Sequence, residues 1–97
     1  MGNVPQTMNE QVTALYEAAE RAFQALKPPY SGSDEDIEWW NVHRNFYITL
    51  IPEKVVCIVN RQIVAIGDDS HEVRKKLETK KGPTGIIDIV QPLYEGL

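Results

Sequence analysis

Four side chains that could hold a metal ion or transfer protons lie close together, at Asp68, Asp69, His71 and Glu72. Oxygen-rich groups of this kind coordinate divalent ions. The same residues also suit the start of a helix, where carboxylates face the positive end of the helix dipole and cap backbone N–H groups. Neighbouring side chains cannot all converge on one ion, so capping is our main interpretation and a metal-dependent activity is an alternative. His43 could complete such a site only if its helix lay alongside.

A nucleophilic centre is not indicated by the remaining reactive groups. Cys57 is the single cysteine and lies in an apolar run, where a free cysteine behaves as a small apolar residue. A nucleophile needs exposure and an activating base. The sequence has no Ser-His-Asp, Cys-His or zinc-ligand spacing, and residues 82–85 lack the lysine of a phosphate-binding loop. We therefore expect a protein that is not an enzyme and has no cofactor.

Basic side chains crowd one stretch of the second half of the chain, at Arg74, Lys75, Lys76, Lys80 and Lys81. The whole chain has 14 acidic and 10 basic residues and a net charge of −4, which opposes attraction to a phosphate backbone. No aromatic stacking platform lies beside the cluster. A solvated helix face is the main interpretation, and a small regulatory protein that contacts nucleic acid through residues 74–81 is a second hypothesis.

Two adjacent tryptophans, Trp39 and Trp40, are candidates for a binding surface. Adjacent helical residues point about 100° apart, so both rings are not expected to enter one core. Tryptophan anchors many protein interfaces, although packing against the first helix would satisfy it equally well. With Tyr16 and Phe23 they form our candidate interaction surface. The leading hypothesis is a protein-interaction or self-association module, forming a homo-oligomer such as a dimer.

An amphipathic helix is the clearest element of the first third of the chain. Thr7 and Glu10 have capping-box spacing, which predicts a helix start near residue 8. Apolar residues then recur every three or four positions, and residues 28–29 are prolines that must end the helix. We predict a helix over 8–26 and a linker over 27–33.

A second helix is predicted to start where Ser33 and Asp36 repeat the capping spacing. It is expected to run to about Tyr47, although residues 46–51 are β-branched and aromatic enough for a strand. Two apolar runs then follow, at 54–59 and 62–66.

A hairpin is predicted for these runs because Asn60-Arg61 joins them and asparagine tolerates the left-handed backbone of a tight turn. Both runs are apolar at nearly consecutive positions, which indicates that helices cover both faces of the sheet. A third helix with Asp69 or Ser70 as its cap precedes a last strand at 86–90. Placing this strand beside the first makes an antiparallel sheet and leaves the second strand as an edge, open unless it is covered.

The sequence therefore predicts one α+β domain over residues 1–97, with two helices followed by strand, strand, helix and strand (ααββαβ). Residues 34–97 form its α-β-β-α-β core. With one cysteine and no apolar signal or membrane segment, we expect a soluble cytoplasmic protein without membrane contact.

The run IPEKVVCIVNRQIVAIGDDSHEV, at residues 51–73, resembles a family of small uncharacterised prokaryotic domains. Their signature is a proline turn, a VAIV-like strand, a short hairpin, an IVA-like strand, then G-x-D before a helix. The match covers roughly residues 45–91. Family members usually carry glycine where this chain has Glu53 and Arg61. The resemblance implies an αββαβ core and a stand-alone bacterial or archaeal protein, and it supplies no activity or catalytic residues.

Overall fold

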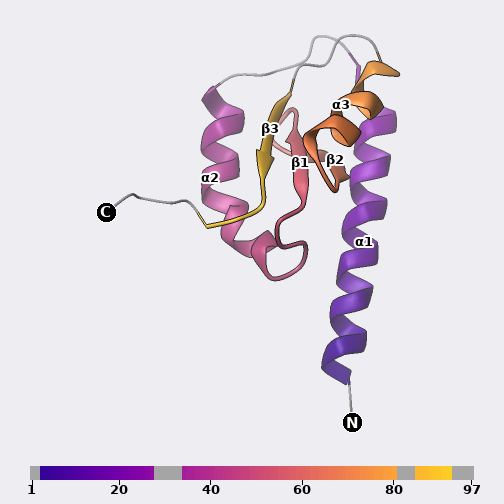
Figure 1. The fold of residues 1–97 in the computed structure, drawn as a ribbon, viewed down its shortest axis with the longest axis vertical. Helices are drawn as coiled ribbons and strands as arrows, with labels where there is room; N and C mark the ends of the chain where they lie inside the picture. Colours follow the sequence, from indigo (N-terminus) through magenta and orange to yellow (C-terminus); the bar gives the residue numbers. More distant parts are fainter. Residues whose placement is uncertain (1–2, 28–33, 81–84, 93–97) are drawn as a thin grey trace.

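The fold is an antiparallel three-stranded sheet with three helices (Figure 1). A computed structural model describes residues 3–27, 34–80 and 85–92. Its elements in chain order are α1 (Asn3–Ala25), α2 (Asp34–Ile48), β1 (Val55–Ile58), β2 (Ile63–Gly67), α3 (Ser70–Glu78) and β3 (Ile86–Ile89). The strand order is β2-β1-β3. The α+β class, the order of the elements and the central place of the most apolar strand are confirmed. Most of the predicted linker, 28–33, lies outside the described residues.

Strand β1 is buried along its whole length, with Val56, Cys57 and Ile58 at 0% exposure. Its side chains alternate between two apolar clusters. Val55 and Cys57 pack with residues of α1 and α3, whereas Val56 and Ile58 pack with Trp40 of α2. A strand with helices on both sides needs apolar residues at every position, which explains the uninterrupted VVCIV run.

A one-residue shift in the β1–β2 pairing explains why β2 is apolar at consecutive positions. Cys57 lies opposite Ala65, but Ile58 lies opposite Ile63. The shift lets Val64 and Ala65 join the same cluster beside α3, while Ile63 joins the cluster beside α2.

The turn between β1 and β2 has a left-handed backbone at both central residues, with φ of 58° at Asn60 and 59° at Arg61. This is the pattern of a two-residue hairpin whose twist matches that of its strands. The fully buried carboxylate of Asp36 accepts the Arg61 N–H at 2.7 Å, so the first turn of α2 is fastened to the hairpin tip. Glu53 also has a positive φ, 63°, so both positions where the resembling family carries glycine are left-handed here.

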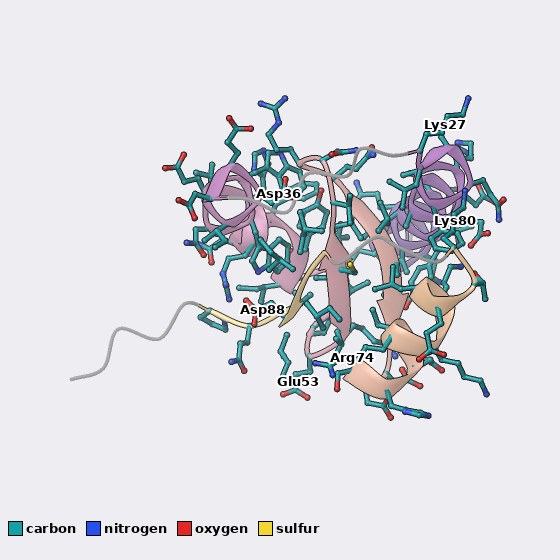
Figure 2. The ribbon with its side chains drawn as sticks, turned by 90° about the horizontal axis from the view of Figure 1, so that it is seen from above. Lys27, Asp36, Glu53, Arg74, Lys80 and Asp88 are labelled. Carbon is teal, nitrogen blue, oxygen red and sulfur yellow. The ribbon has the colours of Figure 1, made fainter. Side chains whose placement is uncertain are left out.

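The three helices cover different parts of the sheet (Figure 2). Helix α2 packs on one face and α3 on the other. Helix α1 lies along β2 and contributes to both clusters, through Ala19 on one side and Phe23 on the other, where Leu26 directly after the helix also packs. The sequence predicted β2 as an edge strand that would be open unless another element covered it. Helix α1 covers this edge.

The start of α1 differs from the sequence prediction, whereas the predicted end of the second helix near Tyr47 is confirmed. Helix α1 starts at Asn3 and not near residue 8, because Pro5 falls in the first turn, where its missing N–H costs no hydrogen bond. Residues 46–48 belong to α2, and the strand alternative for 46–51 is wrong. The N–H groups of Leu50 and Ile51 both donate to the Tyr47 carbonyl, at 3.1 and 2.9 Å, which closes the helix with a turn.

Replacing Arg61 with glycine tests the left-handed turn. We expect R61G to raise the free energy of unfolding by about 0.5–1 kcal/mol, because glycine adopts positive φ without steric cost. Urea denaturation measures the change in the free energy of unfolding, provided that the m-value is unchanged. The control Q62G lies at a position without positive φ and should be destabilising. An R61G midpoint at or below that of the unaltered chain would contradict the turn geometry.

Candidate functional site

The acidic cluster at the start of α3 caps that helix. Asp69 is the N-cap, and its carboxylate accepts the Glu72 N–H at 2.8 Å. Glu72 in turn accepts the Asp68 N–H at 2.7 Å, which completes a reciprocal capping arrangement. Asp68 pairs with Lys54, and this hydrogen bond raises the pKa of Lys54. His71 is exposed. Within residues 3–27, 34–80 and 85–92, no three His, Cys, Asp or Glu side chains are grouped to hold a metal ion.

Gly67 allows this capping arrangement to form. A Cβ at that position would lie 2.6 Å from Glu72 Oε1 and 3.0 Å from Val73 Cγ2. The first distance is too short for a carbon atom and the second is tight, so a side chain at Gly67 would push Glu72 away from the Asp68 N–H. The G-x-D pattern before the helix therefore has a local packing reason.

Cys57 is enclosed in the central strand. Burial raises the pKa of its thiol to about 12. Gly85 closes over the sulfur so tightly that a Cβ there would overlap Sγ. The thiol is thus protonated and inaccessible at neutral pH, which suits a packing role.

The predicted basic face is divided between solvent and α1. Lys76 pairs with Glu20, and this hydrogen bond lowers the pKa of Glu20. Lys80 donates to the carbonyls of Gln24 and Leu26, at 3.0 and 3.3 Å, and so satisfies orphan groups at the end of α1. Both ammonium groups also lie over the Phe23 ring, at 4.9 and 5.6 Å from its centroid. Two of the five basic residues therefore fasten α3 to α1.

The other three basic residues differ in position. Arg74 and Lys75 are exposed, and Lys81 lies outside the described residues.

The adjacent tryptophans have different environments. Trp40 is 1% exposed, and its indole N–H donates to Asp88 of β3 at 2.9 Å. Trp39 is half-buried and stacks on His43 with ring centroids 4.4 Å apart. Phe23 is in the core, whereas Tyr16 is 39% exposed. Of the candidate interaction surface, Trp39 and Tyr16 lie at the surface, and burial removes Trp40 and Phe23 from it.

Arg44 connects α2 to β3, and the sequence analysis did not identify it. The side chain is buried beside the Trp40 ring, pairs with Asp88 at 2.6 Å and donates to the Gln91 carbonyl at 3.0 Å. Arg44 comes four residues after Trp40, so it lies on the same inward face of α2, and this spacing was the sequence signal for its burial. The partner Asp88 is too distant in sequence for spacing to reveal.

An apolar groove lies between α1 and α2. It consists of two adjoining hollows of about 160 and 360 Å³ that share Leu15 and Tyr47. Leu15 and a row of alanines form the α1 wall, and aromatic and aliphatic side chains form the α2 wall. The remaining lining residues are Gln11, Ala14, Ala18, Ala19, Ala22, Trp39, Phe46, Leu50, Gln62 and Ile63. None of these side chains is charged.

Large apolar side chains are exposed on the helices beside this groove. Phe46 is 64% exposed and Val42 is 76% exposed on α2, while Met8 and Tyr16 are 38% and 39% exposed on α1. The sequence analysis missed the contribution of Phe46 and the alanines. Ala14, Ala18 and Ala22 recur every four residues, which is a signal for a narrow helix face, but it does not say what that face meets.

Comparison of the chain with protein-family models, curated proteins and solved structures gave no match. The resemblance to the small prokaryotic domains therefore remains a prediction. Across the described residues, no helix is long and apolar enough to cross a membrane.

Removing the cap of α3 tests the structural role of the acidic cluster. We expect D69A to lower the free energy of unfolding by about 1 kcal/mol, because the Glu72 N–H loses its acceptor. S70A, one position further on, should have little effect. Thermal melts of the unaltered chain should be the same with and without Mg²⁺, Mn²⁺ or Zn²⁺. A melting temperature that rises with one of these ions and falls back in D69A would contradict pure capping.

Alkylation of Cys57 tests its enclosure. We expect iodoacetamide at pH 8 to modify the native chain far more slowly than the chain in urea, as followed by mass spectrometry. The raised pKa also favours the folded state at neutral pH, and this contribution should be lost as the pH rises from the ordinary thiol range towards 12. Equal alkylation rates in native and unfolding conditions would show that the thiol is accessible.

Proposed function

We propose that this chain is a non-enzymatic interaction module that self-associates, with two copies pairing through the α1–α2 groove. The uncharged groove, with a wall of alanines facing a wall of aromatic side chains, is the observation that carries the proposal. Contiguous apolar surface of this kind marks interaction sites in small proteins.

The chain itself carries an element that suits the groove. Met8 and Tyr16 are exposed on α1, whereas Val12 and Leu15, which share their helical spacing, pack partly against the cluster beside α2. Helix α1 has 23 residues and is about 34 Å long. Its N-terminal half extends past the strands (Figure 1). A two-fold axis beside α1 would bring the N-terminal half of each α1 to the groove of the other copy.

The alanine row supports close approach of a second helix. Alanine side chains at positions 14, 18 and 22 leave room for a helix backbone, while Phe46 and Leu50 supply apolar area on the opposite wall. Antiparallel pairing of two α1 helices also brings opposite dipole ends together.

The distribution of charge favours a second copy at this position. Two chains of net charge −4 repel each other wherever their carboxylates meet. Glu10 and Glu17 line a neighbouring hollow of α1, with Asn9 and Thr13, which shares Ala14 with the groove. The groove itself has no carboxylate in its lining, so pairing centred on it keeps the carboxylates of α1 at the margin of the contact.

The required area is modest for a chain of this size. A standard stable interface buries about 800 Å² on each partner, about an eighth of the 6563 Å² surface of this chain. Phe46, which is 64% exposed, lines the groove, and further exposed apolar side chains of α1 and α2 can add to the area that a pairing buries.

The uses of the reactive side chains support a non-enzymatic role. The carboxylates of Asp69 and Glu72 accept backbone N–H groups, Asp68 and Asp88 are in ion pairs, and Cys57 is enclosed. These groups hold the fold together. Asp68, Asp69 and Asp88 line one hollow beside β3, and the Cys57 thiol is not part of its lining.

Adding one negative charge inside the groove tests the proposal. We expect the unaltered chain to reach the mass of a dimer in multi-angle light scattering as concentration rises, and F46E to stay monomeric, because pairing would bury an unpaired carboxylate. N45E is the matched control, since it adds the same charge at the neighbouring exposed position, which does not line the groove. N45E should dimerise like the unaltered chain.

The fold of both variants should be intact, because Phe46 is largely exposed. Circular dichroism and thermal melts check this. An unaltered chain that is strictly monomeric at high concentration would contradict the proposal, and so would an F46E chain that still dimerises.

A further inference from the structure

The outer edge of β3 has unpaired backbone groups. Lys54 and Val90 are directly opposite each other, and the Val90 N–H donates to the Lys54 carbonyl at 2.8 Å. Because bonded and non-bonded pairs alternate along an antiparallel ladder, Ile86 and Asp88 direct their backbone groups towards β1. Ile87 and Ile89 then direct theirs away from the sheet.

Part of this edge is already occupied. The Ile89 N–H is held by the Asp88 carboxylate at 2.8 Å. The N–H and carbonyl of Ile87 and the carbonyl of Ile89 are without a strand partner among the described residues. The opposite edge of the sheet, at β2, is covered by α1, so β3 is the edge at which a further strand can pair.

A trough of about 510 Å³ runs beside this edge on the α3 side of the sheet. Its apolar lining is Val55, Ile87 and Ile89, and Ile89 is 42% exposed. Helix α3 packs more on β2 and β1 than on β3, and Figure 2 shows Glu53 and Arg74 on the same side of the sheet as α3. Apolar side chains of an added strand would find partners on this uncovered part of the sheet.

The charges around the trough determine which segment it suits. Its lining contains four carboxylates and one guanidinium, from Glu53, Asp68, Asp69, Asp88 and Arg74. Lys54 pairs with Asp68 and Arg44 pairs with Asp88, so Glu53 and Asp69 against Arg74 leave the surroundings with a small net negative charge. Lysine or arginine side chains are complementary to them, and acidic side chains are repelled.

We propose that the β3 edge binds an extended segment of a partner protein in which apolar and basic residues alternate, as a fourth strand of the sheet. The backbone of Ile87 supplies hydrogen bonds, the apolar lining receives alternate side chains, and the carboxylates select basic residues. This site is distinct from the α1–α2 groove, so its test does not depend on whether the chain self-associates.

Titration with a short peptide tests the proposal. The probe is an end-capped heptapeptide of alternating lysine and valine with a fluorescent label, and the control replaces each lysine with glutamate. Fluorescence anisotropy with the full chain should show saturable binding of the lysine peptide, weakening with salt, and no binding of the glutamate peptide.

Three variants locate the binding. We expect I87P to weaken the lysine peptide about fivefold to tenfold, because it removes an edge donor without removing a β1–β3 hydrogen bond. I89K should weaken binding and I89E should strengthen it, and Ile89 is exposed enough for the fold to be kept. Ile87 is partly buried against the core, so circular dichroism and a thermal melt must show that the I87P chain is folded. F46E, on the other binding surface, should bind the peptide as the unaltered chain does.

The outcomes separate cleanly. Equal binding of the lysine and glutamate peptides would overturn the selectivity for basic residues. A folded I87P chain with unchanged affinity, together with I89K and I89E chains that do not differ, would overturn the location at β3. Absence of saturable binding at low salt would overturn the proposal as a whole.

Discussion

The burial of β1 on both faces is the constraint on which the rest of the structure depends. Val56 and Ile58 require cover from α2, and Val55 and Cys57 require cover from α1 and α3. Burying each such side chain stabilises the fold by about 1.5–3 kcal/mol, and exposure of either face would remove several of these contributions. A chain of 97 residues can provide this cover only by placing one helix on each face and a third along an edge.

This arrangement determines which surfaces are left uncovered. Helix α1 serves both apolar clusters from the β2 edge, so it stands apart from α2 and a groove separates the two helices. Lys76 and Lys80 hold α3 against α1, so α3 packs more on β2 than on β3. The position of α1 therefore leaves the groove, and the position of α3 leaves the trough beside β3.

Much of the fold could be predicted because its signals are local. The VVCIV run, the Asn60-Arg61 turn and the caps of α3 each lie within a few residues, and the strand order followed from connection rules. The surfaces could not be predicted in the same way. Trp40 and Phe46 are both apolar residues of α2, and only the tertiary structure distinguishes the one that donates to Asp88 in the core from the one beside the groove. Arg44 and Asp88 are likewise joined across 44 positions.

Amide hydrogen exchange at two protein concentrations tests the claim that the groove pairs with a second copy most directly, because it reports the location of the contact as well as its existence. Between about 10 µM and about 1 mM, exchange should slow in residues 8–22 of α1 and 42–50 of α2, while the amides of β1 remain the slowest at both concentrations. Exchange that is the same at both concentrations, or slowing confined to α3, would contradict the account.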